Sequence, residues 1–84
     1  MTLFTREREQ GVARLGIAAT RKIGGAVVRN RAKRLVREFF RHHKPAAAVD
    51  IVVVPRREMI DAPFEQIEAE FATLLKRSVS RAHA

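Results

Sequence analysis

The sequence predicts an α+β fold in which two helices cover one small sheet, a two-layer α/β sandwich. Two segments, residues 26–43 and 63–81, repeat apolar side chains at helical spacing. Residues 13–20 alternate as a half-buried strand does, and residues 49–54 form an almost continuously apolar, β-branched run. With a further short strand at residues 2–5, the predicted order is strand, strand, helix, strand, helix.

The first two strands are expected to be joined by a hairpin loop, because residues 6–11 are polar and end in a glycine. In the second strand Leu15 and Ile17 point to one side, while the other side carries small or polar residues. That bare side either lets a ligand or another backbone approach or lies under a helix. A covering helix is the commoner outcome.

The helix at residues 26–43 is expected to be amphipathic, with a basic polar face. Gly24 and Gly25 precede it, and Pro45 stops it. The apolar arc consists of Val28, Ala32, Leu35, Val36, Phe39 and Phe40. The opposite arc consists of Asn30, Lys33, Arg34, Arg37 and Arg41, with Arg29 and Arg31 on its flanks.

Residues 49–54 are expected to be covered on both faces or to lie at the centre of the sheet, and Pro55 ends them. Asp61 and Pro63 open the last helix, whose early glutamates and late basic residues match the helix dipole. Its buried stripe is expected to be Phe64, Ile67, Phe71, Leu74, Leu75 and Val79. This helix is therefore expected to be structural.

Length and composition limit the class of protein. The 84 residues suffice for a single domain, residues 1–84, and the absence of cysteine excludes disulfides and thiolate metal sites. No apolar run approaches the roughly 20 residues that span a bilayer, and residues 1–10 lack the apolar core of a signal peptide. A cytoplasmic protein with no membrane partner is the default expectation.

Positive charge is concentrated in one segment. Lys and Arg total 17 against 9 acidic residues, a net charge of +8. Between Thr20 and Lys44 the only acid is Glu38, and the basic residues are Arg21, Lys22, Arg29, Arg31, Lys33, Arg34, Arg37, Arg41 and Lys44. This segment carries the whole net charge, so a polyanion-binding surface is favoured over a solubilising face, which usually mixes both signs.

The start of the basic helix suits folded RNA. Arginine binds phosphate bidentately, and the Asn30 amide can donate and accept hydrogen bonds toward a base edge or a 2′-hydroxyl. Gly24 and Gly25 let backbone N–H groups approach a phosphate at the positive end of the helix. A membrane-surface helix would need its apolar face free for lipid, and a helix-turn-helix DNA reader would need a preceding helix. The sequence favours neither.

No active site is expected within the chain. Glu65 and Glu68 are expected on the solvated outer face of the last helix. His42 and His43 are adjacent and are expected to point in different directions, which makes them a poor metal or nuclease pair.

Residues 20–34 resemble the signature of a known family. They read Thr-Arg-Lys-Ile-Gly-Gly-Ala-Val-Val-Arg-Asn-Arg-Ala-Lys-Arg. The bacterial ribonuclease P protein family has Ser-Lys-Lys-Val-Gly-Asn-Ala-Val-x-Arg-Asn-Arg-x-Lys-Arg, followed by Arg-Glu. Thr20, Arg21 and Gly25 depart from it, and Ile23 stands where the family has Val. The resemblance extends closely over residues 13–54 and, by pattern, over the last helix.

The resemblance implies the ribonuclease P protein fold and an accessory subunit of an endoribonuclease that matures the 5′ end of precursor tRNA. Catalysis would belong to the RNA subunit with Mg²⁺, and the chain itself would bind no cofactor or metal. The residues expected to bind ribonuclease P RNA are Arg29, Asn30, Arg31, Lys33, Arg34 and Arg37, with Arg21 and Lys22 at the loop and Arg14 from the sheet. Arg41 and Lys44 are assigned a general electrostatic role.

Family members carry a helix and a strand ahead of the strand at residues 2–5, so the chain is expected to be shortened at its N-terminus. In the family that helix and the sheet form a cleft that binds the 5′ leader of precursor tRNA, and leader binding is therefore left open. A shortened chain is expected to be a marginal monomer that self-associates or is stabilised by RNA. The alternatives are a non-enzymatic RNA-binding module, such as a ribosomal or assembly protein, and a DNA-binding protein.

Overall fold

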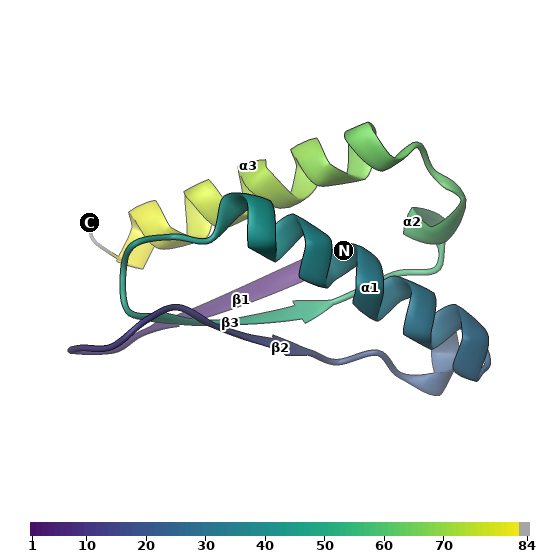
Figure 1. The fold of residues 1–84 in the computed structure, drawn as a ribbon, viewed down its shortest axis with the longest axis horizontal. Coiled ribbons are helices and arrows are strands. Elements are labelled where there is room, and N and C mark those ends of the chain that lie inside the picture. The colour runs from purple at the N-terminus through teal and green to yellow at the C-terminus, as the bar shows by residue number, and fades with distance from the viewer. Residues whose placement is uncertain (83–84) are drawn as a thin grey trace.

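The computed structural model describes residues 1–82, and the side chains of residues 1–79. Three strands and two long helices follow one another in the predicted order, with two short additions. The elements are β1 (Thr2–Glu7), β2 (Arg14–Ile17), a 3-10 turn η1 (Arg21–Ile23), α1 (Ala26–His43), β3 (Val49–Val54), α2 (Glu58–Asp61) and α3 (Phe64–Ala82). Both long helices lie on one face of the sheet, so the predicted two-layer α+β architecture is confirmed (Figure 1).

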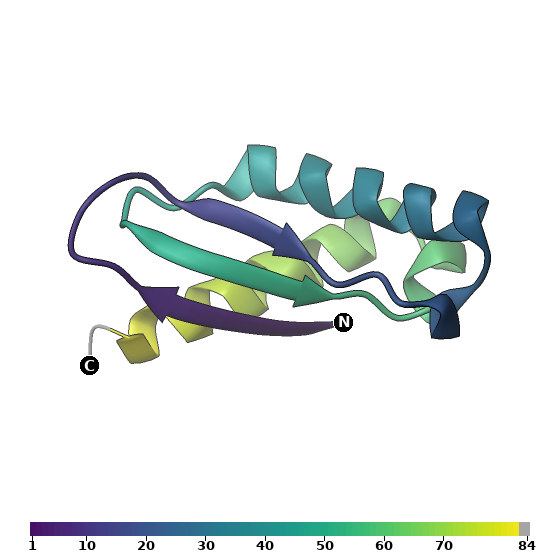
Figure 2. The same cartoon turned by 90° about the horizontal axis from the view of Figure 1, so that it is seen from below.

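The sheet has the order β1-β3-β2, with β1 antiparallel and β2 parallel to β3 (Figure 2). The central position predicted for residues 49–54 is therefore correct. The predicted hairpin between the first two strands is wrong, because β3 lies between them. The most apolar strand takes the centre of the sheet, where ladders on both sides satisfy its backbone groups and a helix layer covers its side chains.

The connection from β2 through α1 to β3 joins two adjacent parallel strands. Figure 2 shows this crossover to be left-handed, whereas about 98% of such crossovers are right-handed. Since parallel strands end at the same edge of a sheet, this connection brings η1 and the first turn of α1 near the end of β3 (Figure 2).

Strand register sorts the sheet into a covered and an open face. Ile51 and Val53 are fully buried toward the helices. Their neighbour Val52, in register with Phe4 and Gly16, points the other way and is 41% exposed. No helix among residues 1–82 covers that side (Figure 1). The bare side of the second strand thus lies on the open face, and the expectation that a helix covers it was wrong.

The core joins the two long helices through aromatic contacts. The Phe39 ring centroid lies 5.2 Å from that of Phe64 and 5.7 Å from that of Phe71. Phe39 and Phe71 are fully buried, whereas Phe64 remains 38% exposed. Met59 of α2, a helix that the sequence analysis did not predict, is buried in the same core. The predicted stripes of both helices are therefore buried or half-buried except at Phe64, whose expected burial was wrong, and their polar faces point outward.

Candidate nucleic-acid interface

The outer face of α1 presents the predicted cations to solvent. Asn30, Arg31, Arg34 and Arg37 are exposed, while Arg29 and Lys33 are half-buried at its margins. We call this set, Arg29, Asn30, Arg31, Lys33, Arg34 and Arg37, the cationic face. Within the described side chains, no carboxylate forms an ion pair with any member of it. The face is therefore neither buried nor neutralised by the chain's own acids.

Helix α1 begins without the usual capping groups. Its N-cap residue is Gly25, no side chain caps it, and the first turn contains no acid. The first N–H groups of an α-helix have no partner within the helix, and the helix dipole adds positive potential there. Arg21 and Lys22 are exposed on η1, just ahead of this terminus. A phosphate would meet backbone donors and two cations at this end.

The turn before α1 depends on Gly24 and on a residue that the sequence analysis missed. Gly24 has φ +141°, and a Cβ atom there would lie 2.9 Å from the Cβ atom of Val28. Arg57, from the segment after β3, donates from Nη1 to the carbonyl of Ile23 at 3.0 Å. The two residues of this bond are 34 positions apart. No local pattern signals it, because it depends on β2 and β3 ending at the same edge.

A hollow of about 250 Å³ lies on the outer side of α1. Its lining is Val27, Asn30, Arg31 and Arg34, which are neighbours on one helical face. Val27 is 83% exposed and was not selected by the sequence analysis. The hollow therefore combines an apolar surface, an amide and two guanidinium groups.

Arg14 is not grouped with the cationic face. It lies on the open sheet face, where Nε is 2.8 Å from Asp50 Oδ1 and Nη2 is 3.2 Å from Oδ2. Arg8 also approaches Asp50, with Nε 2.9 Å from Oδ1. The hydrogen bond from Arg14 lowers the pKa of Asp50, and the same contact raises the pKa of Arg14. Asp50 thus ties the ends of the two edge strands to the central one.

The end of α1 is held against α3 by two histidines. His43 Nε2 lies 3.1 Å from Glu68 Oε1, and His42 Nδ1 lies 3.5 Å from the same oxygen. His42 Nε2 also approaches Glu38 at 3.2 Å. The expectation that the two rings diverge was wrong, because α3 brings one carboxylate to both. Glu68 is accordingly half-buried rather than solvated, whereas Glu65 is exposed as expected.

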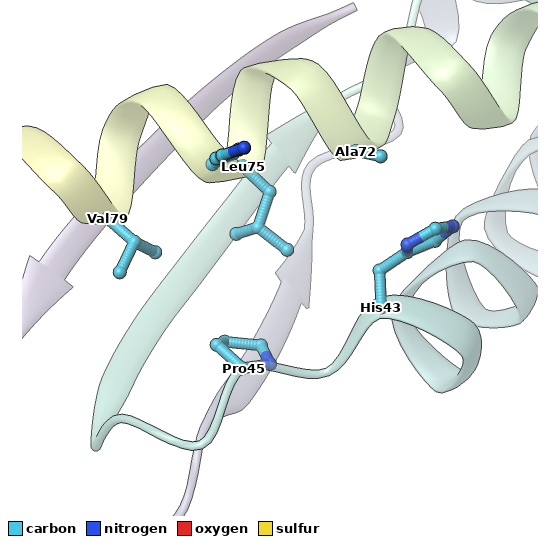
Figure 3. Close-up of a pocket in the computed structure, with 6 residues that line it drawn as sticks. His43, Pro45, Ala72, Leu75 and Val79 are labelled. Carbon is cyan, nitrogen blue, oxygen red and sulfur yellow. The ribbon is translucent and has the colours of Figure 1, made fainter.

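An apolar groove of about 380 Å³ lies next to this contact (Figure 3). It is lined by His43, Pro45, Ala72, Leu75, Lys76 and Val79.

The described residues contain no group of three or more His, Asp or Glu side chains that could hold a metal ion. They also contain no helix that is long and apolar enough to cross a bilayer.

The family model described as Ribonuclease P matches residues 1–79. The chain belongs to the ribonuclease P protein family. It is 46% identical over 69 residues to the ribonuclease P protein component of Desulfovibrio desulfuricans, covering 77% of this chain and 53% of that one. It is 39% identical over 80 residues to the component of Pelotomaculum thermopropionicum, covering 93% of this chain and 71% of that one.

Solved structures of ribonuclease P proteins share the fold. The Thermotoga maritima protein superimposes with a TM-score of 0.79 at 38% identity, covering 89% of this chain and 74% of that one. The Staphylococcus aureus protein gives 0.74 at 35% identity, with coverages of 90% and 72%. These matches confirm the predicted fold and give no support to the alternative of a ribosomal or assembly protein. The chain spans only 53% to 66% of the first three curated relatives.

Proposed function

We propose that the chain is the protein subunit of a ribonuclease P and binds its catalytic RNA through the cationic face of α1. The observation that carries the proposal is that this face is solvent-exposed and forms no ion pair with a carboxylate among the described side chains. Family membership supplies the partner, because proteins of this family are components of ribonuclease P. Arg21 and Lys22 extend the contact beyond the helix, and Arg41 and Lys44 add general attraction.

In the proposed mechanism the protein neutralises phosphates and the RNA does the chemistry. The helix holds several guanidinium groups at fixed spacing, so that they can bind the phosphates of RNA strands that lie close together. Their positive charge reduces the repulsion between these strands. Mg²⁺ bound by the RNA subunit supplies the chemistry of cleavage, and no residue of this chain takes part in it. If about six phosphates are neutralised, the logarithm of affinity falls with the logarithm of salt concentration at a slope of roughly −4 to −5.

The second proposed partner is precursor tRNA, on the open face of the sheet. Phe4 is 58% exposed and lies in register with Val52, so an aromatic ring stands on an uncovered apolar surface. Such a ring can stack on an unpaired base. Arg14 and Arg6, in register on either side of Asp50, add positive charge along the same face.

The open face also supports self-association in the absence of RNA. Phe4 and Val52 are exposed on it, and β1 lies at the sheet edge with one side of its ladder unpaired. Both features favour contact between copies unless RNA covers them. Sedimentation over a range of concentrations tests this, and a concentration-independent, high-melting monomer would contradict it.

We also propose the cytoplasm as the location, where precursor tRNA is made in bacteria.

A cleavage assay tests the main proposal. Ribonuclease P RNA is incubated with precursor tRNA at a Mg²⁺ concentration too low for the RNA to act alone, with and without the chain. We expect the chain to restore cleavage at the mature 5′ end, and we expect an Arg31→Ala/Arg34→Ala variant to restore much less. Binding without restored cleavage would reduce the chain to an RNA-binding module, and equal competition by duplex DNA would contradict RNA recognition altogether.

A further inference from the structure

The hollow on α1 differs from the rest of the cationic face, because it is not only charged. Val27 contributes an apolar side chain that is 83% exposed, at helical spacing from Asn30 and Arg31. Phosphate contact requires no apolar surface, and a single exposed valine by itself requires no explanation. What distinguishes Val27 is its place in a depression whose other members are an amide and two guanidinium groups.

We infer that this hollow receives one unstacked nucleobase of the RNA partner. Its volume of about 250 Å³ lies below the range of drug-sized ligand pockets and suits a single planar ring. Val27 would contact the base, and the guanidinium planes of Arg31 and Arg34 would lie along its faces or hold its flanking phosphates. Unpaired bases in loops and bulges of RNA can be bound in this way, whereas bases within a helix cannot.

Asn30 gives the hollow its selectivity. Its amide carries both donors and acceptors, so it can pair with a base edge in two hydrogen bonds, which a lysine or arginine cannot do with an edge that needs both. Asn30 is exposed and the described side chains offer it no hydrogen-bond partner, so the amide is available to a ligand. The charged residues then fix the register of the RNA, and Val27 with Asn30 selects one nucleotide within it.

The inference rests on the proposed function and is tested with ribonuclease P RNA as the probe. The variants are Val27→Ser, Asn30→Ala, their double variant, and Val12→Ser as the matched control. Val12 is a second exposed valine, at 64%, outside the cationic face. All three side chains replaced are exposed, so thermal melting should be unchanged.

We expect Val27→Ser to weaken RNA binding by about fivefold and Asn30→Ala by about tenfold. The double variant should lose no more than about tenfold, because both residues act on one base. The salt slope should equal that of the wild type, since no phosphate contact is removed. In base-specific chemical probing, one nucleotide protected by the wild type should become reactive with both single variants and remain protected with Val12→Ser.

Two outcomes separate this inference from the function on which it rests. If the wild type binds with a steep salt slope but Val27→Ser behaves as Val12→Ser and no nucleotide changes reactivity, the base-binding hollow is refuted and the proposed function stands. If the wild type fails to bind the RNA, the proposed function is refuted, and the inference that the hollow binds a base is refuted with it.

Discussion

Helices α1 and α3 lie side by side on one face of the sheet and bury the same kind of apolar stripe, yet their outer faces differ (Figure 1). Helix α3 begins with Glu65 in its first turn and carries Lys76 and Arg77 late, as the helix dipole favours. Helix α1 has no acid in its first turn, no capping side chain, and cations from Arg29 onward.

The difference teaches which helix is shaped by folding alone. Positive charge near a helix N-terminus opposes the dipole, and an uncapped terminus leaves donors without partners. A helix selected only for stability would carry an acid rather than cations in its first turn, as α3 does. Departures from local stability rules are expected where a surface serves a partner. Helix α1 departs from them at the end where RNA is proposed to bind.

The largest expected effect tests the feature that both helices share, their buried apolar stripes. Phe39→Ala in α1 and Phe71→Ala in α3 remove fully buried rings that contact each other, so each should lower the free energy of unfolding by about 3–5 kcal/mol. Urea denaturation measures this. Phe4→Ala, at 58% exposure, is the control and should change stability by less than about 0.5 kcal/mol. Unequal losses in the two helices would mean that one of them contributes little to the core.

The second prediction tests the outer faces with equal changes of charge. Arg31→Glu/Arg34→Glu on α1 should weaken binding to ribonuclease P RNA by about 100-fold at physiological salt and reduce the salt slope by about 2. Lys76→Glu/Arg77→Glu on α3 replaces two exposed cations and alters the net charge equally. It should weaken binding by no more than about threefold, through net charge alone. Similar losses from both pairs would show that attraction is diffuse and that α1 has no special place.

The helices were predicted more accurately than the sheet because their limits are local. Helix α1 begins directly after Gly25 and ends before Pro45, as the sequence predicts. The limits of strand β3 are also local, because Pro55 follows it directly. The predicted pairing of the first two strands was wrong, because strand order depends on which strand occupies the centre of the sheet. That position is decided by contacts between segments far apart in the sequence. The short helix α2 was not predicted, because its four residues are too few to show helical periodicity.

The same division applies to the candidate site. The cationic face follows from helical periodicity, and the structure places all of its members on one helix. Arg57 and the convergence of both histidines on Glu68 could not be predicted, because each depends on contacts across the fold. Val27 could have been found from the helical wheel, as an apolar residue outside the apolar arc, but the predicted surface comprised only charged and amide side chains.

The third prediction concerns the start of α1. Gly24→Ala should lower the free energy of unfolding by about 1–3 kcal/mol, since its φ of +141° and the nearby Val28 both oppose a side chain. Gly25 has φ −74° and open space around it. Gly25→Asn should therefore add a cap and stabilise the chain by a few tenths of a kcal/mol. If Gly24→Ala melts like the wild type, the turn before α1 is not fixed by this residue.

The smallest effect expected is that of Asp50, and it decides whether Arg14 belongs with the cationic face. Hydrogen bonding to Arg14 lowers the pKa of Asp50 below its ordinary 3.8 in the folded chain. The carboxylate therefore stabilises the fold at neutral pH, and this contribution is lost as pH falls below about 4. Asp50→Asn should slightly destabilise the chain at pH 7 and remove that component of acid sensitivity, as thermal melting across pH 3–7 would show.

RNA binding by the same variant is the more informative measurement. Asp50→Asn releases Arg14 from its ion pair, so a guanidinium that contacted the catalytic RNA would then bind it more tightly. Because register places Arg14 on the open sheet face and α1 covers the other, we expect the affinity for ribonuclease P RNA to stay within about twofold. A clear gain would place Arg14 in the same interface as Arg31 and Arg34. An unchanged affinity would leave α1 and the turn before it responsible for binding, and would confirm that the two long helices differ in function.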